Sequence, residues 1–142
     1  MSADTAVLAE GLGFPESPRW HQGQLWCTDH VARQVLTVDA TGTVQVRHET
    51  EDRPSGIGWR PDGGLLMVAM HGRRVVRIGA EGGEVLATLT THGTPYACML
   101  GGDDRRTLFV TTSEGRGDDP RHAPRTGRIE VVEVEATGVG LP

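Results

Sequence analysis

The sequence predicts an all-β protein built from β-propeller blades, and three observations carry this prediction. The 142 residues include 20 glycines and 8 prolines, and the β-branched and aromatic residues lie in short runs between them. Such a pattern is typical of many short strands joined by tight turns. A segment rich in proline, tryptophan and glycine recurs after 39 residues. Each repeat contains room for four short strands, and four strands in roughly 40 residues is the period of a propeller blade.

The repeat is clearest between Pro15–Cys27 and Pro54–Met67, which both contain a tryptophan and a glycine-containing turn. A third and looser copy begins at Pro95 and resumes at Thr107. We therefore expect one domain spanning residues 1–142, with blades at roughly 13–50, 53–91 and 94–136.

Eleven strands are expected within these blades. In the first blade they are Glu16–Trp20, Gln24–Asp29, Gln34–Asp39 and Thr43–His48. In the second they are Gly56–Arg60, Leu65–Met70, Arg74–Ile78 and Glu84–Thr90. In the third they are Tyr96–Leu100, Thr107–Thr112 and Gly127–Glu135, with a polar surface loop over Ser113–Thr126 before the last.

The third blade lacks a fourth strand, and the strand-like segment Thr5–Glu10 is otherwise unassigned. We expect this segment, from the same chain or from a second copy, to complete the blade and to cover its open edge. Known propellers have four to eight blades, so three blades cannot close a ring. Two copies related by a two-fold axis would make six blades, which predicts a homodimer. The alternative is a half-propeller that stays open.

Charge and hydropathy exclude several classes of protein. The formal net charge of −5 argues against a nucleic-acid partner, and no apolar run is long enough to span a membrane. Residues Met1–Leu12 include acidic residues and no basic cluster, so we expect no secretory signal and a cytoplasmic location. Cys27 and Cys98 each lie in an apolar strand-like run and are expected to be buried free thiols.

One short stretch, Gly13–Trp20, contains the most specific candidate for a functional residue. Pro15 and Pro18 flank Glu16 and restrict the backbone to extended conformations, so the Glu16 carboxylate is held in a stiff segment. A carboxylate held in this way is a candidate metal ligand; the alternative is a solvated loop glutamate. The three tryptophans are expected to be core residues of the blades: Trp20, Trp26 and Trp59.

Other combinations of residues are weaker candidates. Asp29 and His30 suggest a general-base pair, but neighbouring residues on a strand point to opposite faces, which favours structural or turn roles. No histidine pair has metal-ligand spacing on a helix face, no serine lies in a nucleophile elbow, and no glycine pattern indicates a nucleotide site. No catalytic residue and no organic cofactor is therefore assigned.

Taken together, the motifs resemble a known family. Phe14–Trp20, followed by Gln24–Asp29, resembles the opening of the senescence marker protein/gluconolactonase (regucalcin-like) family of six-bladed propellers. Arg53–Arg77 resembles the second blade of that family, and Gly82–Thr112 resembles its final blade. Members of the family are about twice as long, so about three blades are missing here, with the join near Arg77–Glu81.

The resemblance implies a lactone hydrolase that uses one divalent cation (Ca²⁺, Mg²⁺, Mn²⁺ or Zn²⁺) at the mouth of the central channel. The family's ligands are a Glu, an Asn and an Asp on different blades, and only Glu16 matches one of them. The repeat places Ser55 and Tyr96 at the sister positions, as candidates to line the channel.

In a homodimer, two Glu16 carboxylates would face each other across the channel. The implied ligand is a small-molecule lactone or a sugar-like compound. The alternative function is a non-catalytic half-propeller that dimerises and binds at most a cation or a small ligand.

Overall fold

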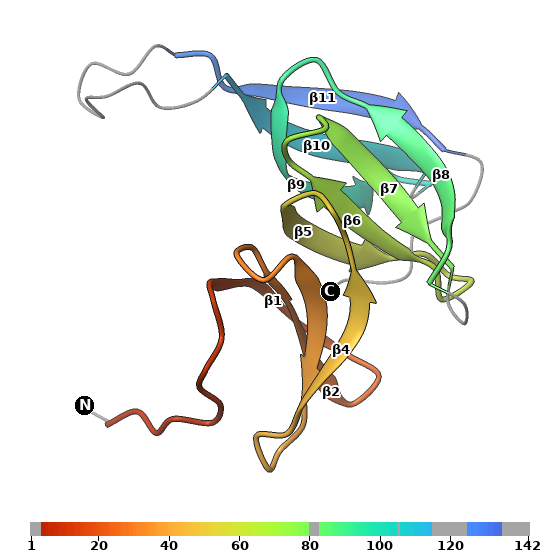
Figure 1. Ribbon diagram of the computed structural model, residues 1–142. Helices are drawn as coiled ribbons and strands as arrows, with labels where there is room; N and C mark the ends of the chain where they lie inside the picture. The colour runs from red at the N-terminus through yellow and green to blue at the C-terminus, as the bar shows by residue number, and fades with distance from the viewer. Residues whose placement is uncertain (1–3, 80–82, 105, 115–124, 135–142) are drawn as a thin grey trace.

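The chain folds into three antiparallel sheets that lie side by side (Figure 1). The computed structural model describes residues 4–79, 83–104, 106–114 and 125–134. The first sheet consists of β1 (Pro15–His21), β2 (Gln24–Asp29), β3 (Gln34–Val38) and β4 (Val44–Glu49). The second consists of β5 (Pro54–Trp59), β6 (Leu65–Ala69), β7 (Arg74–Ile78) and β8 (Val85–Thr90). The third consists of β9 (Thr94–Gly101), β10 (Thr107–Ser113) and β11 (Arg128–Glu133).

Each sheet is a simple meander, in which strands that follow one another in the chain are neighbours in the sheet. The eleven expected strands are all present, with ends that differ by at most two residues among the described positions. The polar segment expected before β11 falls largely on residues 115–124, which lie outside the described residues, as does the end of the third blade beyond residue 134.

The tight turns follow from local residue chemistry. Between β1 and β2, Gln22 and Gly23 both have positive φ angles, of 50° and 75°. Two consecutive positive φ angles are what a two-residue hairpin requires, and glycine adopts them at low cost. Between β3 and β4, the Asp39 carboxylate accepts hydrogen bonds from the backbone N–H groups of Thr41 and Thr43, which closes the turn.

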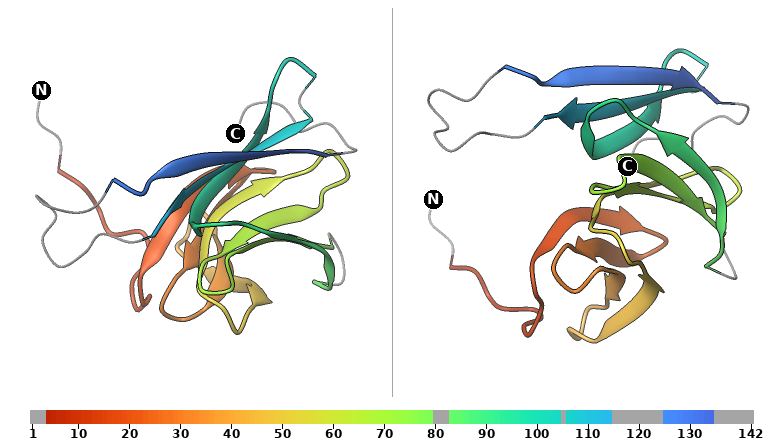
Figure 2. Two further views of the ribbon diagram at one scale, coloured as in Figure 1. Left: turned by 90° about the horizontal axis from the view of Figure 1, so that it is seen from above. Right: turned by 45° about the horizontal axis from the view of Figure 1, so that its top comes forward.

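The sheets pack face to face, with the second sheet between the other two, as Figure 2 shows. Between the first and second sheets, Val35 packs with a cluster from β5, β6 and β7: Ile57, Leu65, Met67, Val76 and Ile78. Between the second and third sheets, a second cluster unites residues of β6, β7, β9 and β10: Leu66, Val68, Val75, Cys98, Leu100, Leu108 and Val110. The second sheet is therefore apolar on both faces, as a propeller blade must be. Cys27 and Cys98 are buried free thiols, which confirms the prediction.

The innermost strands of neighbouring sheets are in direct contact. A Cβ atom added to Gly56 of β5 would lie 2.6 Å from the Cα atom of Ala97 in β9. No side chain fits in that space, so glycine at position 56 allows the two backbones to approach. The sheets therefore converge on β1, β5 and β9 in the way that blades converge on a propeller axis.

The prediction that Thr5–Glu10 is a strand of the same chain's third blade is wrong. These residues form no strand, and none of the described strands pairs with them. The segment instead lies beside the first sheet, where the carbonyl oxygen of Leu8 approaches Gly42 (Figure 1). Just after the segment, hydrogen bonds from Gly13 and Phe14 to Asp29 hold the chain against β2 of the first sheet, whereas β11 belongs to the third sheet. That a second copy supplies the missing strand stays a prediction.

The prediction that all three tryptophans are core residues is also wrong for Trp20, whose side chain is 70% exposed. Trp26 and Trp59 pack partly buried against the cluster between the first two sheets. Trp20 is on the opposite face of the first sheet, which no other sheet of the described residues covers. Among the described residues, no helix is long and apolar enough to cross a membrane.

Candidate functional site

The three innermost strands begin at the same end of the molecule and share one local design. Each has a proline at its start or second position, Pro15, Pro54 and Pro95, and each has a bulge next to that proline. The residues after the prolines are Glu16, Ser55 and Tyr96, which are the sister positions that the repeat predicts. Bulges redirect side chains near the ends of strands and are common next to functional sites.

The Glu16 carboxylate is held in place but incompletely paired. The bulge follows it directly, and Ser17 takes a positive φ of 53°, a strained conformation for a non-glycine residue. Thr28 donates a 3.3 Å hydrogen bond to the backbone carbonyl of Glu16 and so fixes its position against β2. The Oε1 atom of Glu16 is buried and has no hydrogen-bond partner among the described residues. A buried oxygen of this kind is costly unless a ligand satisfies it.

His30 lies beside that unsatisfied oxygen. Its Nδ1 atom is 3.6 Å from Glu16 Oε1 and 3.3 Å from the carbonyl oxygen of Pro54. The edge of the Phe14 ring packs against the imidazole, with 6.2 Å between ring centroids. The start of β1, the turn after β2 and the start of β5 thus meet at one point. Sequence reasoning considered His30 only as the partner of Asp29 and did not place it next to Glu16.

Asp29 has the structural role that strand alternation predicts. Its buried carboxylate accepts hydrogen bonds from four backbone N–H groups, those of Gly13, Phe14, Val31 and Ala32. Burial alone would raise the pKa of Asp29, but the four donors outweigh it and lower the pKa below its usual value. Asp29 therefore clamps the turn that carries His30 against the segment leading into β1.

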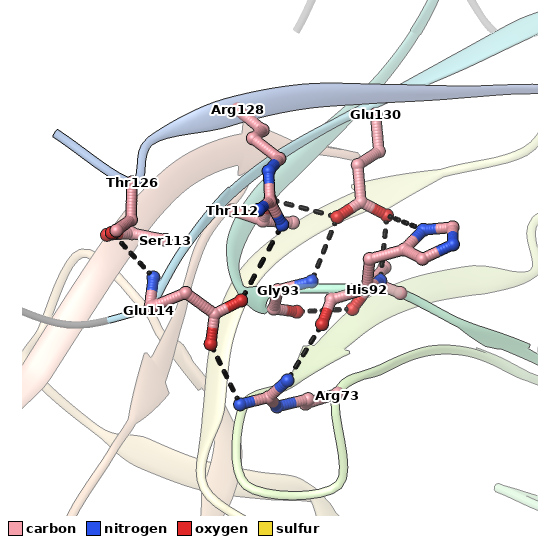
Figure 3. Close-up of polar contacts among 10 residues, drawn as sticks. Arg73, His92, Gly93, Thr112, Ser113, Glu114, Thr126, Arg128 and Glu130 are labelled. Atoms are coloured by element: carbon pink, nitrogen blue, oxygen red, sulfur yellow. Dashed lines mark hydrogen bonds and ion pairs between the residues drawn. The ribbon is translucent and has the colours of Figure 1, made fainter.

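The other two sheets have equivalent clamps built from different chain positions. In the second, Asp52 accepts hydrogen bonds from the N–H groups of His71 and Gly72. In the third, Glu130 accepts them from the N–H groups of His92 and Gly93 and from the Thr112 hydroxyl (Figure 3). Partial burial would raise the pKa of Glu130, but these bonds outweigh it and lower the pKa to about 2. The start of each innermost strand is thus held by a charged carboxylate.

Ser55 and Tyr96 are joined to each other. The Ser55 hydroxyl is buried and donates a 2.7 Å hydrogen bond to the carbonyl oxygen of Tyr96. The Tyr96 side chain is partly exposed at the third sheet. This hydrogen bond links the second and third sheets. Because the Ser55 hydroxyl donates its proton to Tyr96, only the lone pairs of its oxygen are available to a ligand. That both residues line a channel stays a prediction.

The donor set at Glu16 suits a cation only in part. No cluster of three or more His, Cys, Asp or Glu side chains occurs among the residues that the structure describes. The groups near Glu16 are instead one carboxylate, one imidazole and one backbone carbonyl. All three can ligate a metal, and a buried carboxylate oxygen without a hydrogen-bond partner among the described residues is suited to bind a positively charged group.

Comparisons with known proteins agree with this architecture. The family described as "SMP-30/Gluconolactonase/LRE-like region" matches residues 14–93. L-arabinolactonase of Azospirillum brasilense is 27% identical over 144 residues, which cover 94% of this chain and 46% of the relative. A solved structure of regucalcin from Agrobacterium tumefaciens, described as a calcium-binding protein, superposes with a TM-score of 0.74 at 18% identity and covers 92% of this chain and 49% of its own.

A gluconolactonase from Xanthomonas campestris superposes with a TM-score of 0.66 at 20% identity, over 89% of this chain and 46% of its own. At these identities the solved structures show the fold alone. The chain spans about half the length of the relatives that it matches.

Proposed function

Because the chain belongs to the SMP-30/gluconolactonase/LRE-like family, we propose that it is a metal-dependent hydrolase of small lactones, with its reaction centre at Glu16. The observation that carries this proposal is the buried and unpartnered Oε1 atom of Glu16 at the start of β1. The resemblance of Phe14–Trp20 to the family's opening motif supports Glu16 as a metal ligand, and the names of the relatives support sugar lactones as the substrate class.

The proposed reaction is the addition of water to the lactone carbonyl, followed by cleavage of the ring C–O bond to give a hydroxy acid. A divalent cation would polarise that carbonyl and lower the pKa of a bound water. The protein would contribute rigidity: the Glu16 bulge, the Asp29 clamp and the hydrogen bond from Ser55 to Tyr96 fix the starts of three strands around the site.

We also propose that two copies of this chain assemble into a six-bladed ring. The outer face of the third sheet supports this assembly, because it is apolar yet uncovered. Met99 and Val131 pair with Phe109 from either side across β10, and Ile129 lies in the next row. All four side chains are exposed, from 39% for Phe109 to 71% for Ile129. A monomer rarely leaves such a contiguous apolar sheet face in water.

The internal repeat indicates what covers this face. The equivalent face of the second sheet, formed by Leu66, Val68 and Val75, packs against the next blade of the chain. The outer face of the third sheet therefore requires the first blade of a second copy, where Trp20 is the exposed apolar residue. Cys27 and Leu36 share that face but are buried, so the contact would centre on the end around Trp20.

The exposed area supports a dimer contact. Three strands of about six residues span a face of roughly 20 by 14 Å. A two-fold ring covers the outer face of the third sheet in both copies, roughly 560 Å², which is more than half of the about 1,000 Å² that a specific interface needs, and the exposed Trp20 side chains add to it. The segment Thr5–Glu10 of the partner would pair with the free edge of β11 in the same assembly, which would cover its exposed Val7 and Leu8 side chains.

A second candidate function is a non-catalytic half-propeller that dimerises and binds at most a cation or small ligand. The observation in its favour is the lack of further carboxylates at the sister positions, where the chain has Ser55 and Tyr96. The two candidates make different predictions about turnover but share the assembly and the cation site.

Hydrolysis of a panel of aldono-lactones, followed by acid release at constant pH, tests the proposed function. We expect activity that disappears with a chelator, returns with added divalent metal and is lost in Glu16→Gln. Activity that survives chelation would overturn the metal-dependent reaction. A folded dimer without activity towards any lactone would leave the non-catalytic candidate.

A further inference from the structure

We propose that His30 Nδ1 and the backbone carbonyl oxygen of Pro54 are cation ligands together with Glu16, so that the site is a mixed nitrogen and oxygen site. This inference rests on the proposed function in one respect, that Glu16 binds a cation. It goes further by naming two ligands that lie within this chain and by predicting which metals they select.

Two distances from His30 Nδ1 carry the inference. His30 Nδ1 is 3.3 Å from the Pro54 oxygen and 3.6 Å from Glu16 Oε1. The first is a long hydrogen bond, and the second exceeds ordinary N–H···O hydrogen bonds, which are about 2.7–3.2 Å. Both separations are also compatible with atoms that share a metal ion: with metal–ligand bonds of about 2.1 Å, they subtend angles of roughly 100° to 120° at the metal, which is the tetrahedral range.

The electrostatics of the site point in the same direction. Glu16 Oε1 is buried without a hydrogen-bond partner among the described residues, and the Pro54 carbonyl oxygen lies 3.3 Å from the same imidazole nitrogen, His30 Nδ1, that faces Glu16. Two electron-rich oxygens facing one imidazole nitrogen need either a proton on that nitrogen or a cation between the three atoms. A proton on Nδ1 would make only a weak hydrogen bond to the Glu16 carboxylate across 3.6 Å. A cation bound by Glu16 Oε1, His30 Nδ1 and the Pro54 carbonyl oxygen would interact favourably with all three.

The three ligands are held before any metal binds. The backbone N–H of His30 donates a 3.0 Å hydrogen bond to the carbonyl of Phe14, which joins the turn after β2 to the segment leading into β1. Asp29 clamps the same turn from the other side. Pro54 is the buried first residue of β5. Because hydrogen bonds and burial already fix the segments that carry these three ligands, little conformational entropy would be lost when a metal binds.

The imidazole decides the metal preference. Ca²⁺ and Mg²⁺ take oxygen ligands almost entirely, whereas Zn²⁺ and Co²⁺ accept histidine nitrogen readily. We therefore expect the site to favour Zn²⁺ over Ca²⁺. The remaining coordination position would be open to water or to a substrate carbonyl, which is the arrangement of catalytic rather than structural zinc sites.

Titration of the metal-free full chain with Co²⁺ and Zn²⁺ tests the inference without any assay of activity. The visible absorption of Co²⁺ reports tetrahedral coordination, and calorimetry reports the affinity and stoichiometry of Zn²⁺. We expect one ion per chain, weak or no response to Ca²⁺, and a loss of affinity on the order of 100-fold or more in His30→Asn, because even indirect contacts to a metal contribute 10–100-fold. His71→Asn is the matched control, since His71 occupies the corresponding turn of the second blade and its side chain is exposed.

The outcomes separate this inference from the proposed function. Metal binding that is lost in Glu16→Gln but unchanged in His30→Asn would overturn the role of His30 and leave the proposed function standing. Absence of binding to the wild-type chain would overturn both. If His30→Asn fails to fold, imidazole ¹⁵N spectra of the wild-type protein decide the question: Zn²⁺ should shift the Nδ1 signal of His30, and an unmoved signal would refute the inference.

Discussion

Gly56 of β5 and Ala97 of β9 bring the backbones of two neighbouring blades into contact, with only 2.6 Å between Ala97 Cα and the place where a Cβ of residue 56 would lie. Ser55 and Tyr96 make the 2.7 Å hydrogen bond one residue earlier on each strand. The two inner strands are therefore fitted to each other beside the candidate site.

Gly56→Ala should destabilise the protein, because its new methyl group meets backbone rather than a flexible side chain. We expect a loss of about 1–3 kcal/mol in the free energy of unfolding, measured by urea denaturation. Gly58→Ala on the same strand is the control, since a Cβ there meets nothing within 4 Å. Equal effects of the two substitutions would contradict the close approach of the blades.

Glu130 should make stability depend on acid pH. Its folded-state pKa, about 2, is below its ordinary value of 4.5. A lowered carboxyl pKa contributes stability above the ordinary value and loses it as the pH falls through the folded one. We expect the wild-type free energy of unfolding to decline between these two pH values and to decline less in Glu130→Gln. Glu10→Gln, at an exposed position, should keep the wild-type slope; identical slopes for all three proteins would refute the clamp.

Phe109→Arg should prevent assembly while leaving the chain folded, because it places a charge in the centre of the exposed face of the third sheet. Light scattering behind a sizing column should give twice the chain mass for the wild type and a single chain mass for the variant. Leu86→Arg, at an exposed position on β8, should remain dimeric. A wild-type protein that is monomeric and well folded would exclude the six-bladed ring.

Glu16→Gln should stabilise the metal-free protein, because it removes a buried charged oxygen that has no hydrogen-bond partner. We expect a gain of about 1 kcal/mol in the free energy of unfolding. Zn²⁺ at 100 times its dissociation constant should add about 2.7 kcal/mol to the wild type and nothing to the variant. A variant that is less stable without metal, yet still stabilised by it, would show that Glu16 is not a ligand.

Much of the fold could be predicted from the sequence because it is encoded locally. Strand positions follow from short apolar runs, and turns follow from glycine and aspartate at places such as Gly23 and Asp39. The repeat adds the equivalence of Pro15, Pro54 and Pro95, and the structure confirms that these residues mark the same bulged start of an inner strand. The prediction that the Asp29 and His30 side chains point in opposite directions also follows from local geometry alone, because side chains alternate along a strand.

Errors arose where placement depends on non-local packing. The segment Thr5–Glu10 has the composition of a strand, but it lies near Gly42 and the clamp of Asp29 rather than near β11. Trp20 occupies the repeat position of the half-buried Trp59, yet it is exposed because none of the described sheets packs against its face of the first sheet. Neither outcome could be predicted from composition.

The sequence by itself determined the number of strands, their grouping into blades and the rigid setting of Glu16, because prolines, glycines and strand periodicity act within a few residues. Only the tertiary structure decided that His30, in the turn after β2, has its Nδ1 atom within 3.6 Å of both Glu16 Oε1 and the Pro54 carbonyl oxygen. The physical reason is that these three groups belong to segments up to 38 residues apart in the chain, and only the packing of one sheet on the next brings them together.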